Sequence, residues 1–416
     1  MTRMALLLLL LVPSVANAQQ ADEVPALPQP VVQPPPAETT SPAPLAPDEP
    51  EAGGMAAERT LAPRYRPAAA SPGGWFGDVG FYVLRPQWSG GNPAFTTTTT
   101  TTLVEPGSPT IEEQLTIAEQ TDFDHDASFA PLVSIGYAGR NGLGLRVRWW
   151  TLEADDSVAG SGPNGVLMQS LRETVTAGYL VPSLLGTTSG FQAVANHVAN
   201  QGDILEVEGR FRNQLDLDVI DAEGIWNTTI GRSSLLASAG VRYAQLGQSF
   251  DGDLGLATDA AEATATLRSH QTFKGAGPTV ALQAHRLIGQ TNLSVYGLSR
   301  GSLLFGESRQ RATTSFQDSF RVDTDLVLRT IASSKSLNSD SLRPVLEFEV
   351  GANWTRSLAA FDLFAESGLV GMAWFNAGNA ANSEALVGSG LGTVDSDSTH
   401  SNLGLIGLRF TTGVRF

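Results

Sequence analysis

Charged residues two positions apart recur in this sequence, and that spacing could let them act together on ions. Arg146 is followed by Arg148, and Glu347 by Glu349. Alternate side chains of a β-strand lie on one face, and opposed arrays of arginine and carboxylate let a pore filter ions by charge. The predicted pore-lining residues are Arg146, Arg148, Arg242, Glu347, Glu349, Asp362 and Glu366. The alternative is that these charges neutralise one another and plug a narrow interior, and the sequence leaves both interpretations open.

Hydrolytic and metal chemistry have weaker support. The histidines, at positions 125, 197, 270, 285 and 400, are scattered, and no Gly-x-Ser-x-Gly elbow stands between a strand and a helix. The acidic stretch 251–262 resembles a calcium loop in its spacing, but Leu256 stands where the sharp turn requires glycine. We therefore expect no catalytic residues, no metal site and no cofactor.

Composition argues against disulfide chemistry and against a nucleic-acid partner. The 416 residues include no cysteine, and the only lysines are Lys274 and Lys335. The formal net charge is −16, which leaves no basic stripe to meet phosphates.

The first 74 residues predict export followed by a tether. Residues 1–18 contain a basic start at Arg3, an apolar run and the small-residue ending Ala16-Asn17-Ala18, which is the pattern of a secretory signal peptide. Residues 19–74 are rich in proline, alanine and acids, so they are expected to form a disordered periplasmic linker. The linker could reach the cell wall, or it could be a leader without a partner, which we favour.

Residues 75–416 read as an all-β domain. Stretches of alternating apolar and polar residues are separated by Gly, Asn, Asp and Ser clusters, with hairpins expected at 140–142 and 289–290. About ten strands can be counted, and no apolar run is long enough for a membrane helix. The candidate strands lie at 75–88, 130–140, 141–153, 214–226, 234–247, 278–288, 291–306, 343–357, 359–375 and 400–416.

A transmembrane antiparallel β-barrel of roughly 8–12 strands fits this pattern better than a secreted sandwich. The strands are long enough for a tilted crossing of a bilayer, and short turns alternate with long polar insertions at 154–203, 248–273 and 307–342. Aromatic residues mark the strand ends, as the girdles of a barrel would. These aromatic residues are Trp75, Phe76, Trp88, Trp149, Trp150, Trp374 and Phe375.

The C-terminal strand supports the barrel. Leu408, Phe410 and Phe416 share one mostly apolar face, and the strand continues to the last residue. Chain termini usually fray, so this strand is expected to insert in the membrane and to close the barrel against another strand.

Several of these stretches resemble the Legionella-type pore-forming major outer membrane proteins. The resemblance covers roughly residues 75–416. It lies in "GFYVLRPQW", "LDLDVIDAEGIW", "ASAGVRYAQLGQSF" and "VLEFEVGANW", and most specifically in the block 273–306. It implies a pore-forming barrel in the outer membrane, and the final phenylalanine resembles the signal that barrel assembly machinery reads.

The expected function is therefore a porin-like channel for passive diffusion of ions and small polar solutes. A non-conducting structural or adhesive surface barrel is the alternative, and an outer-membrane hydrolase is the least favoured class. The expected partners are outer-membrane lipid, the barrel assembly machinery and the permeating solutes, with the cell wall as a further partner of the proline-rich linker.

Overall fold

The structure is a computed structural model of the whole chain. It describes residues 73–104, 111–163, 173–180, 204–231, 233–258, 261–289, 291–322, 325–382 and 401–416. The predicted signal peptide (1–18) and nearly all of the predicted linker (19–74) lie outside the described residues, so both remain predictions. Within the described residues, no helix is long and apolar enough to cross a membrane.

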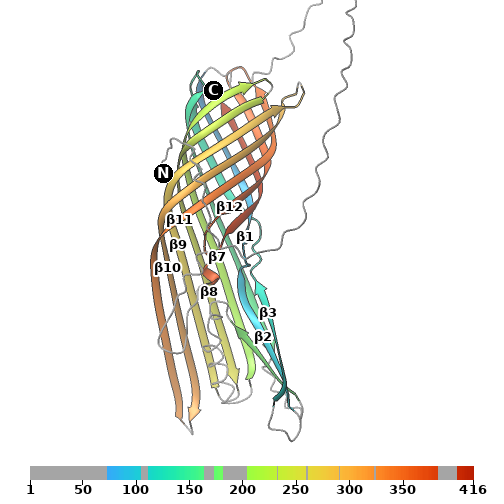
Figure 1. Cartoon of the computed structure of the whole chain (residues 1–416), viewed down its shortest axis with the longest axis vertical. Coiled ribbons are helices and arrows are strands. Elements are labelled where there is room, and N and C mark those ends of the chain that lie inside the picture. The colour runs from blue at the N-terminus through green and yellow to red at the C-terminus, as the bar shows by residue number, and fades with distance from the viewer. Residues whose placement is uncertain are drawn as a thin grey trace, which may run out of the picture. The chain divides into compact units, whose positions relative to one another are not determined.

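Ten antiparallel strands close into a barrel, which confirms the predicted fold class (Figure 1). Each barrel strand pairs with the barrel strands that precede and follow it in the chain, and β13 pairs with β1 to complete the ring. The barrel strands are β1 (Gly74–Trp88), β4 (Ser128–Ala138), β5 (Leu143–Pro163), β7 (Ile204–Ile230), β8 (Ser233–Thr258), β9 (Ala261–Leu287), β10 (Leu293–Val322), β11 (Asp325–Ser357), β12 (Asp362–Trp374) and β13 (Leu403–Arg415).

The last strand closes the barrel as expected. β13 pairs with both β12 and β1, and the backbone N–H of Phe416 donates to the carbonyl of Trp75 at 2.9 Å. Leu408, Phe410 and Phe416 are exposed on the outer surface. Because all edges of the sheet are paired in this ring, the backbone leaves no unsatisfied polar groups facing lipid there.

The alternation of side chains produces an apolar outer face. Phe348 and Leu369 are 57% and 61% exposed, whereas their neighbours Glu347 and Glu366 are buried inside the barrel. Such exposure would be costly in water and is expected only where the surface meets lipid. The outer face is therefore the lipid-contacting face of the barrel.

The predicted aromatic girdle is only partly correct. Trp75 and Trp149 do project outward, but Trp88, Trp150 and Trp374 are buried within the barrel. Trp149 and Trp150 are adjacent in one strand and must point to opposite faces, so they cannot both contact lipid. The rim near the chain ends does carry exposed aromatic residues, including Trp75 and Tyr137, whose rings meet edge to face at 5.6 Å.

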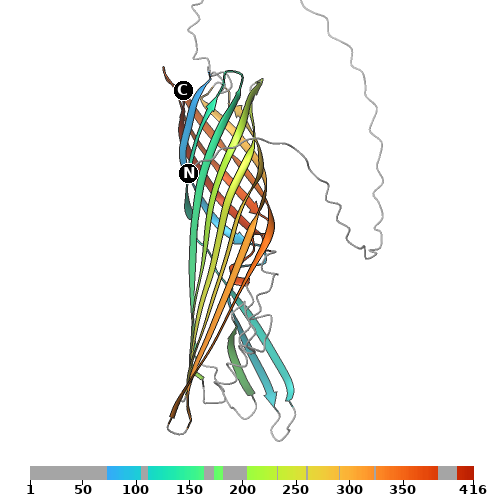
Figure 2. The ribbon, with the colours of Figure 1, turned by 90° about the vertical axis from the view of Figure 1, so that its left-hand side faces the viewer.

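Strands β7 to β11 are much longer than predicted. They contain 26 to 33 residues, whereas a tilted strand needs only about 9–11 residues to cross a bilayer. Figures 1 and 2 show them continuing as one sheet beyond β1, β12 and β13. The insertions predicted at 248–273 and 307–342 are thus mostly paired strand. In the second, Thr313 and Thr314 lie opposite Ser334 and Ser333, and threonine favours strands.

The short turns and both described chain ends lie at one end of the barrel, which assigns that end to the periplasm. Gly142 has a φ of +81° in the turn between β4 and β5, and Gly289 has a φ of +62° between β9 and β10. The long strands extend from the opposite end. A separate sheet there has the order β3 (Ile111–Asp122), β2 (Pro93–Val104) and β6 (Glu173–Leu180), and the threonine run 96–102 forms its central strand.

Candidate functional site

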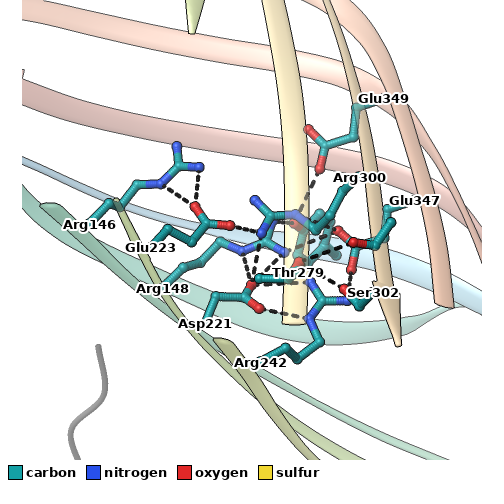
Figure 3. A network of polar contacts seen from close by, with 12 residues as sticks. Arg146, Arg148, Asp221, Glu223, Arg242, Thr279, Arg300, Ser302, Glu347 and Glu349 are labelled. Carbon is teal, nitrogen blue, oxygen red and sulfur yellow. Dashed lines mark hydrogen bonds and ion pairs between the residues drawn. The ribbon is translucent and has the colours of Figure 1, made fainter. Parts of the chain in front are cut away.

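The predicted pore-lining charges meet in a network of ion pairs inside the barrel (Figure 3). Asp221 of β7 accepts from Arg148 of β5 at 2.9 Å and from Arg242 of β8 at 2.7 Å. Glu347 of β11 lies 2.6 Å from Arg242, 3.1 Å from Arg148 and 3.4 Å from Arg300 of β10. All five side chains are almost completely buried. These ion pairs join five strands, and those from Glu347 of β11 to β5 and β8 cross the interior of the barrel.

Two further groups of ion pairs extend this network, and one of them reaches β12 and β13. Arg146 pairs with Glu223 at 2.6 Å, and Glu223 also pairs with Arg300. Arg409 of β13 lies 2.7 Å from Glu349 and 3.6 Å from Glu366 of β12. The network thus contains five arginines and five carboxylates, namely Arg146, Arg148, Arg242, Arg300, Arg409, Asp221, Glu223, Glu347, Glu349 and Glu366.

This arrangement differs from the opposed arrays of the pore hypothesis. Positive and negative groups contact one another directly, so their fields cancel over short distances. Six of the seven predicted residues join the network. The seventh, Asp362, is the first residue of β12, is half-buried, and takes part in none of the network's ion pairs.

Four members of the network were not predicted from the sequence: Asp221, Glu223, Arg300 and Arg409. Each stands at the parity that faces the interior, and Asp221 and Glu223 repeat the spacing of two that marks Arg146 and Arg148. The sequence signal of Asp221 and Glu223 was weak because Val219 and Leu217, which lie on the same face of β7, are apolar. The inward face of β7 is therefore not polar over the whole strand, and alternation alone does not mark it as polar.

A layer of apolar side chains fills the interior of the barrel on the side of the network that faces away from the periplasm. Trp150 and Leu152 follow Arg148 along β5 at the same parity, and both are fully buried. Tyr82 lies between the two layers: its hydroxyl donates to Glu349 at 3.3 Å and its ring meets Trp150 edge to face. The layer also includes Leu84, Leu132, Leu217, Leu246, Phe273, Leu304, Val345, Met372, Trp374, Leu403 and Leu405.

A cavity opens on the other side of the network, at the periplasmic end. Its volume is about 120 Å³, and both apolar and ionisable side chains line it. Asp78, His285 and Arg415 face it together with Arg146 and Arg409. Periplasmic water and ions can therefore reach the network from one side, while the apolar layer separates it from the other.

The described histidines lie in different parts of the chain. His285 stacks on Tyr296 in the barrel wall, and His270 contacts Thr272 on an exposed strand. His125 is buried and follows β3 in the chain. His197 and His400 lie outside the described residues. In the described part of the chain, no group of three His, Asp or Glu side chains could hold a metal ion. Asp251 and Asp253 pair instead with Arg268.

His125 has amide partners and an aromatic neighbour. Its Nε2 lies 3.0 Å from Oδ1 of Asn213 and 3.2 Å from Nδ2 of Asn92, and its ring packs on Trp88. Burial lowers the pKa of His125 below its usual value of 6.5, although the hydrogen bond with Asn213 and nearby Asp156, Asp155 and Asp124 oppose that shift.

This lowered pKa predicts a loss of stability in mild acid. Below about pH 6.5 the unfolded chain binds a proton at His125 that the folded chain does not, so stability falls as the pH decreases from about 6.5 through the folded pKa. Urea unfolding in detergent, followed between pH 7.5 and 5.0, should show a decline that is smaller in a His125→Gln variant. An equal decline in both proteins would assign the effect to other groups.

Comparison with solved structures finds only distant likenesses among those reported below. Among solved structures, the chain is similar to the outer membrane protease OmpT from Escherichia coli, at 10% identity and a TM-score of 0.34, covering 83% of this chain and 97% of that chain. It is also similar to a Pseudomonas aeruginosa FadL homologue, at 9% identity and a TM-score of 0.17, covering 84% and 91%. Likenesses this distant carry no argument about function.

Sequence comparison is more specific. No curated protein matches the chain. The family model described as the Legionella pneumophila major outer membrane protein precursor matches residues 74–416, which is the whole of the barrel domain. With the closed barrel and its apolar outer face, this match places the protein in the outer membrane. The chain belongs to the Legionella major outer membrane protein family.

Proposed function

We propose that this protein is a structural surface barrel whose membrane-spanning part does not conduct in the conformation described. The observation that carries this proposal is the filled cross-section. The balanced ion-pair network and the adjacent apolar layer occupy the interior one above the other. Apolar constrictions exclude water and ions by dewetting, so either layer alone would hinder diffusion.

The distribution of strand length supports a role at the surface. β10 and β11 pair continuously from the periplasmic turn to the register Val322↔Asp325, far beyond the length needed to cross a bilayer. Their outer part carries exposed charged residues such as Glu307 and Arg309. A long, paired and polar sheet outside the membrane suits the display of a surface to the exterior, which agrees with a structural or adhesive barrel.

A porin-like channel, which the sequence analysis favoured, is the second candidate. The periplasmic cavity supports it, because ionisable side chains line an open mouth that leads to the network. For conduction, both the network and the apolar layer would have to rearrange. We therefore rank this function below the structural barrel.

Recording single-channel currents from the full chain in a planar bilayer separates the two proposals. We expect insertion, verified by heat-modifiable migration of the sample, without discrete current steps. Steps whose size scales with salt concentration would overturn the structural proposal and favour the porin. In that case, neutralising Arg146 and Arg148 together should shift the reversal potential toward cation selectivity.

We also propose three partners for this barrel. Lipid contacts the exposed apolar face, and the barrel assembly machinery reads the strand that ends at Phe416. Contact with the cell wall would involve the predicted linker, which lies almost wholly outside the described residues.

A further inference from the structure

The chain folds back into the barrel after β12. Residues 375–382, which follow Trp374, are here called the inner segment. Two of them, Asn376 and Gly378, have backbone φ angles of +54° and +74°. Asparagine and glycine are the residues that adopt such angles most readily. The segment ends in the short helical turn η3 (Ala380–Asn382), coloured orange-red in Figure 1. Ala377, Asn379, Ala380 and Ala381 are completely buried.

Three side chains from the barrel wall converge on one backbone oxygen of this segment. The carbonyl of Ala377 accepts from Nη1 of Arg343 at 2.8 Å, from Nε2 of Gln248 at 3.3 Å and from Nε2 of Gln271 at 3.4 Å. Gln248 also accepts from the backbone N–H of Ala380 at 3.2 Å. Nε2 of Gln248 also donates to the carbonyl of Gly378 at 3.2 Å. A neutral carbonyl has two lone pairs, and Arg343 and Gln271 already match them at Ala377.

Arg343 is the unusual member of this set, because it is a buried cation with no carboxylate partner in the part of the chain that the structure describes. It is 1% exposed, and no carboxylate of the described residues forms an ion pair with it. Its other contacts are the hydroxyls of Ser308 and Ser341 and the ring of Phe273, 4.3 Å from the guanidinium carbon. Buried charges are normally paired or hold a ligand, and the arginines of the ion-pair network are all paired.

Further hydrogen-bonding capacity around the inner segment is unused. Nδ2 of Asn213 is a buried donor, and Oε1 of Gln271 a buried acceptor, without partners among the described residues. Asn213 connects to the segment through Asn92, which accepts from Asn379 at 3.1 Å. Among the described residues, the surroundings of the inner segment are thus rich in donors, and Arg343 is their one cation without a carboxylate partner.

We propose that Arg343, Gln248 and Gln271 form a binding site for a small carboxylate, and that the Ala377 carbonyl occupies this site when the ligand is absent. The guanidinium fork matches a carboxylate in a bidentate geometry, and the two amide groups supply donors on its other side. A carboxylate brings a negative charge that no described residue places beside Arg343. It therefore competes with the neutral carbonyl and displaces the inner segment.

Thiol labelling of the full chain in detergent tests this competition. The protein has no cysteine, so Ala380→Cys provides a single thiol that a maleimide reaches only when the inner segment leaves its site. The probe is acetate, compared with its uncharged isostere acetamide, with ionic strength held constant by sodium chloride. Ala244→Cys is the matched control, because Ala244 is equally buried but lies in the barrel wall.

We expect acetate to raise the labelling rate of the Ala380→Cys chain saturably, by about tenfold, because the extra free energy of a charge-assisted hydrogen bond corresponds to about that ratio of equilibrium constants. Acetamide and the Ala244→Cys control should show no such increase. Adding Arg343→Gln should abolish the acetate response and raise the basal rate. If that variant does not fold, Gln271→Leu should weaken the response instead.

Two results would overturn the proposal. A labelling rate of the Ala380→Cys chain that does not change with acetate would show that no carboxylate displaces the segment. An equal response to acetamide would show that charge plays no part.

Discussion

Replacing Glu347 by glutamine is expected to cost about 3–5 kcal/mol of unfolding free energy, the usual penalty for removing one partner of a buried ion pair. Glu347 faces Arg148, Arg242 and Arg300, each within 3.4 Å. The amide keeps the shape of the side chain but removes the charge. Arg148, Arg242 and Arg300 would then share fewer carboxylates, although all three side chains are almost completely buried.

The measurement is equilibrium unfolding by urea or guanidinium in phospholipid vesicles, followed by tryptophan fluorescence. Glu307→Gln is the control, because Glu307 pairs with Arg309 at an exposed position and should leave the midpoint unchanged. A Glu347→Gln protein as stable as the parent would show that the network is hydrated and that its charges are not held by direct pairing.

A second substitution tests whether charge balance is the cause. Combining Glu347→Gln with Arg300→Met removes one charge of each sign from the network. The loss in the double variant should be smaller than the sum of the two single losses by about 0.5–3 kcal/mol, the range of coupling between contacting groups. Additive losses would mean that packing, not charge, decides the stability of this layer.

Alternation in the sequence was sufficient to predict the barrel and its lipid face. On β11, the apolar parity of Leu346, Phe348 and Val350 is exposed, and the parity of Glu347 and Glu349 is inside. The period of two is a property of the single strand, so no knowledge of its neighbours is required. The same holds for the closing strand, where Phe410 and Arg409 take opposite faces.

The partners of each charge could not be predicted in this way. Arg148 and Glu347 are far apart in the chain and meet only because the ring closes and its strands are staggered. Similarly, alternation does not tell where the interior changes from charged to apolar. Arg148 and Trp150 share a parity of β5, yet one belongs to the network and the other to the apolar layer. The inner segment has no periodic pattern at all, and its two left-handed residues, Asn376 and Gly378, read only as a loop.

The apolar layer is expected to be the second main source of stability, which Trp150→Ala tests. Trp150 is completely buried and packs against Tyr82. Removing a buried tryptophan leaves a cavity that the rigid wall of paired strands cannot fill, and costs about 3–5 kcal/mol. The adjacent Trp149 is the control, because it is 38% exposed on the lipid face, where acyl chains can occupy the space left by Trp149→Ala.

The same unfolding measurement should therefore show a clearly larger loss for Trp150→Ala than for Trp149→Ala. Each variant removes one indole from the same strand, so differences in strand propensity and fluorescence cancel in the comparison. Equal losses would mean that both positions meet a fluid environment and that the barrel is not filled. Conversely, a large loss of stability at Trp150 alone would show that the apolar layer inside the barrel behaves as a protein core. That behaviour is the physical basis for assigning the barrel a structural role.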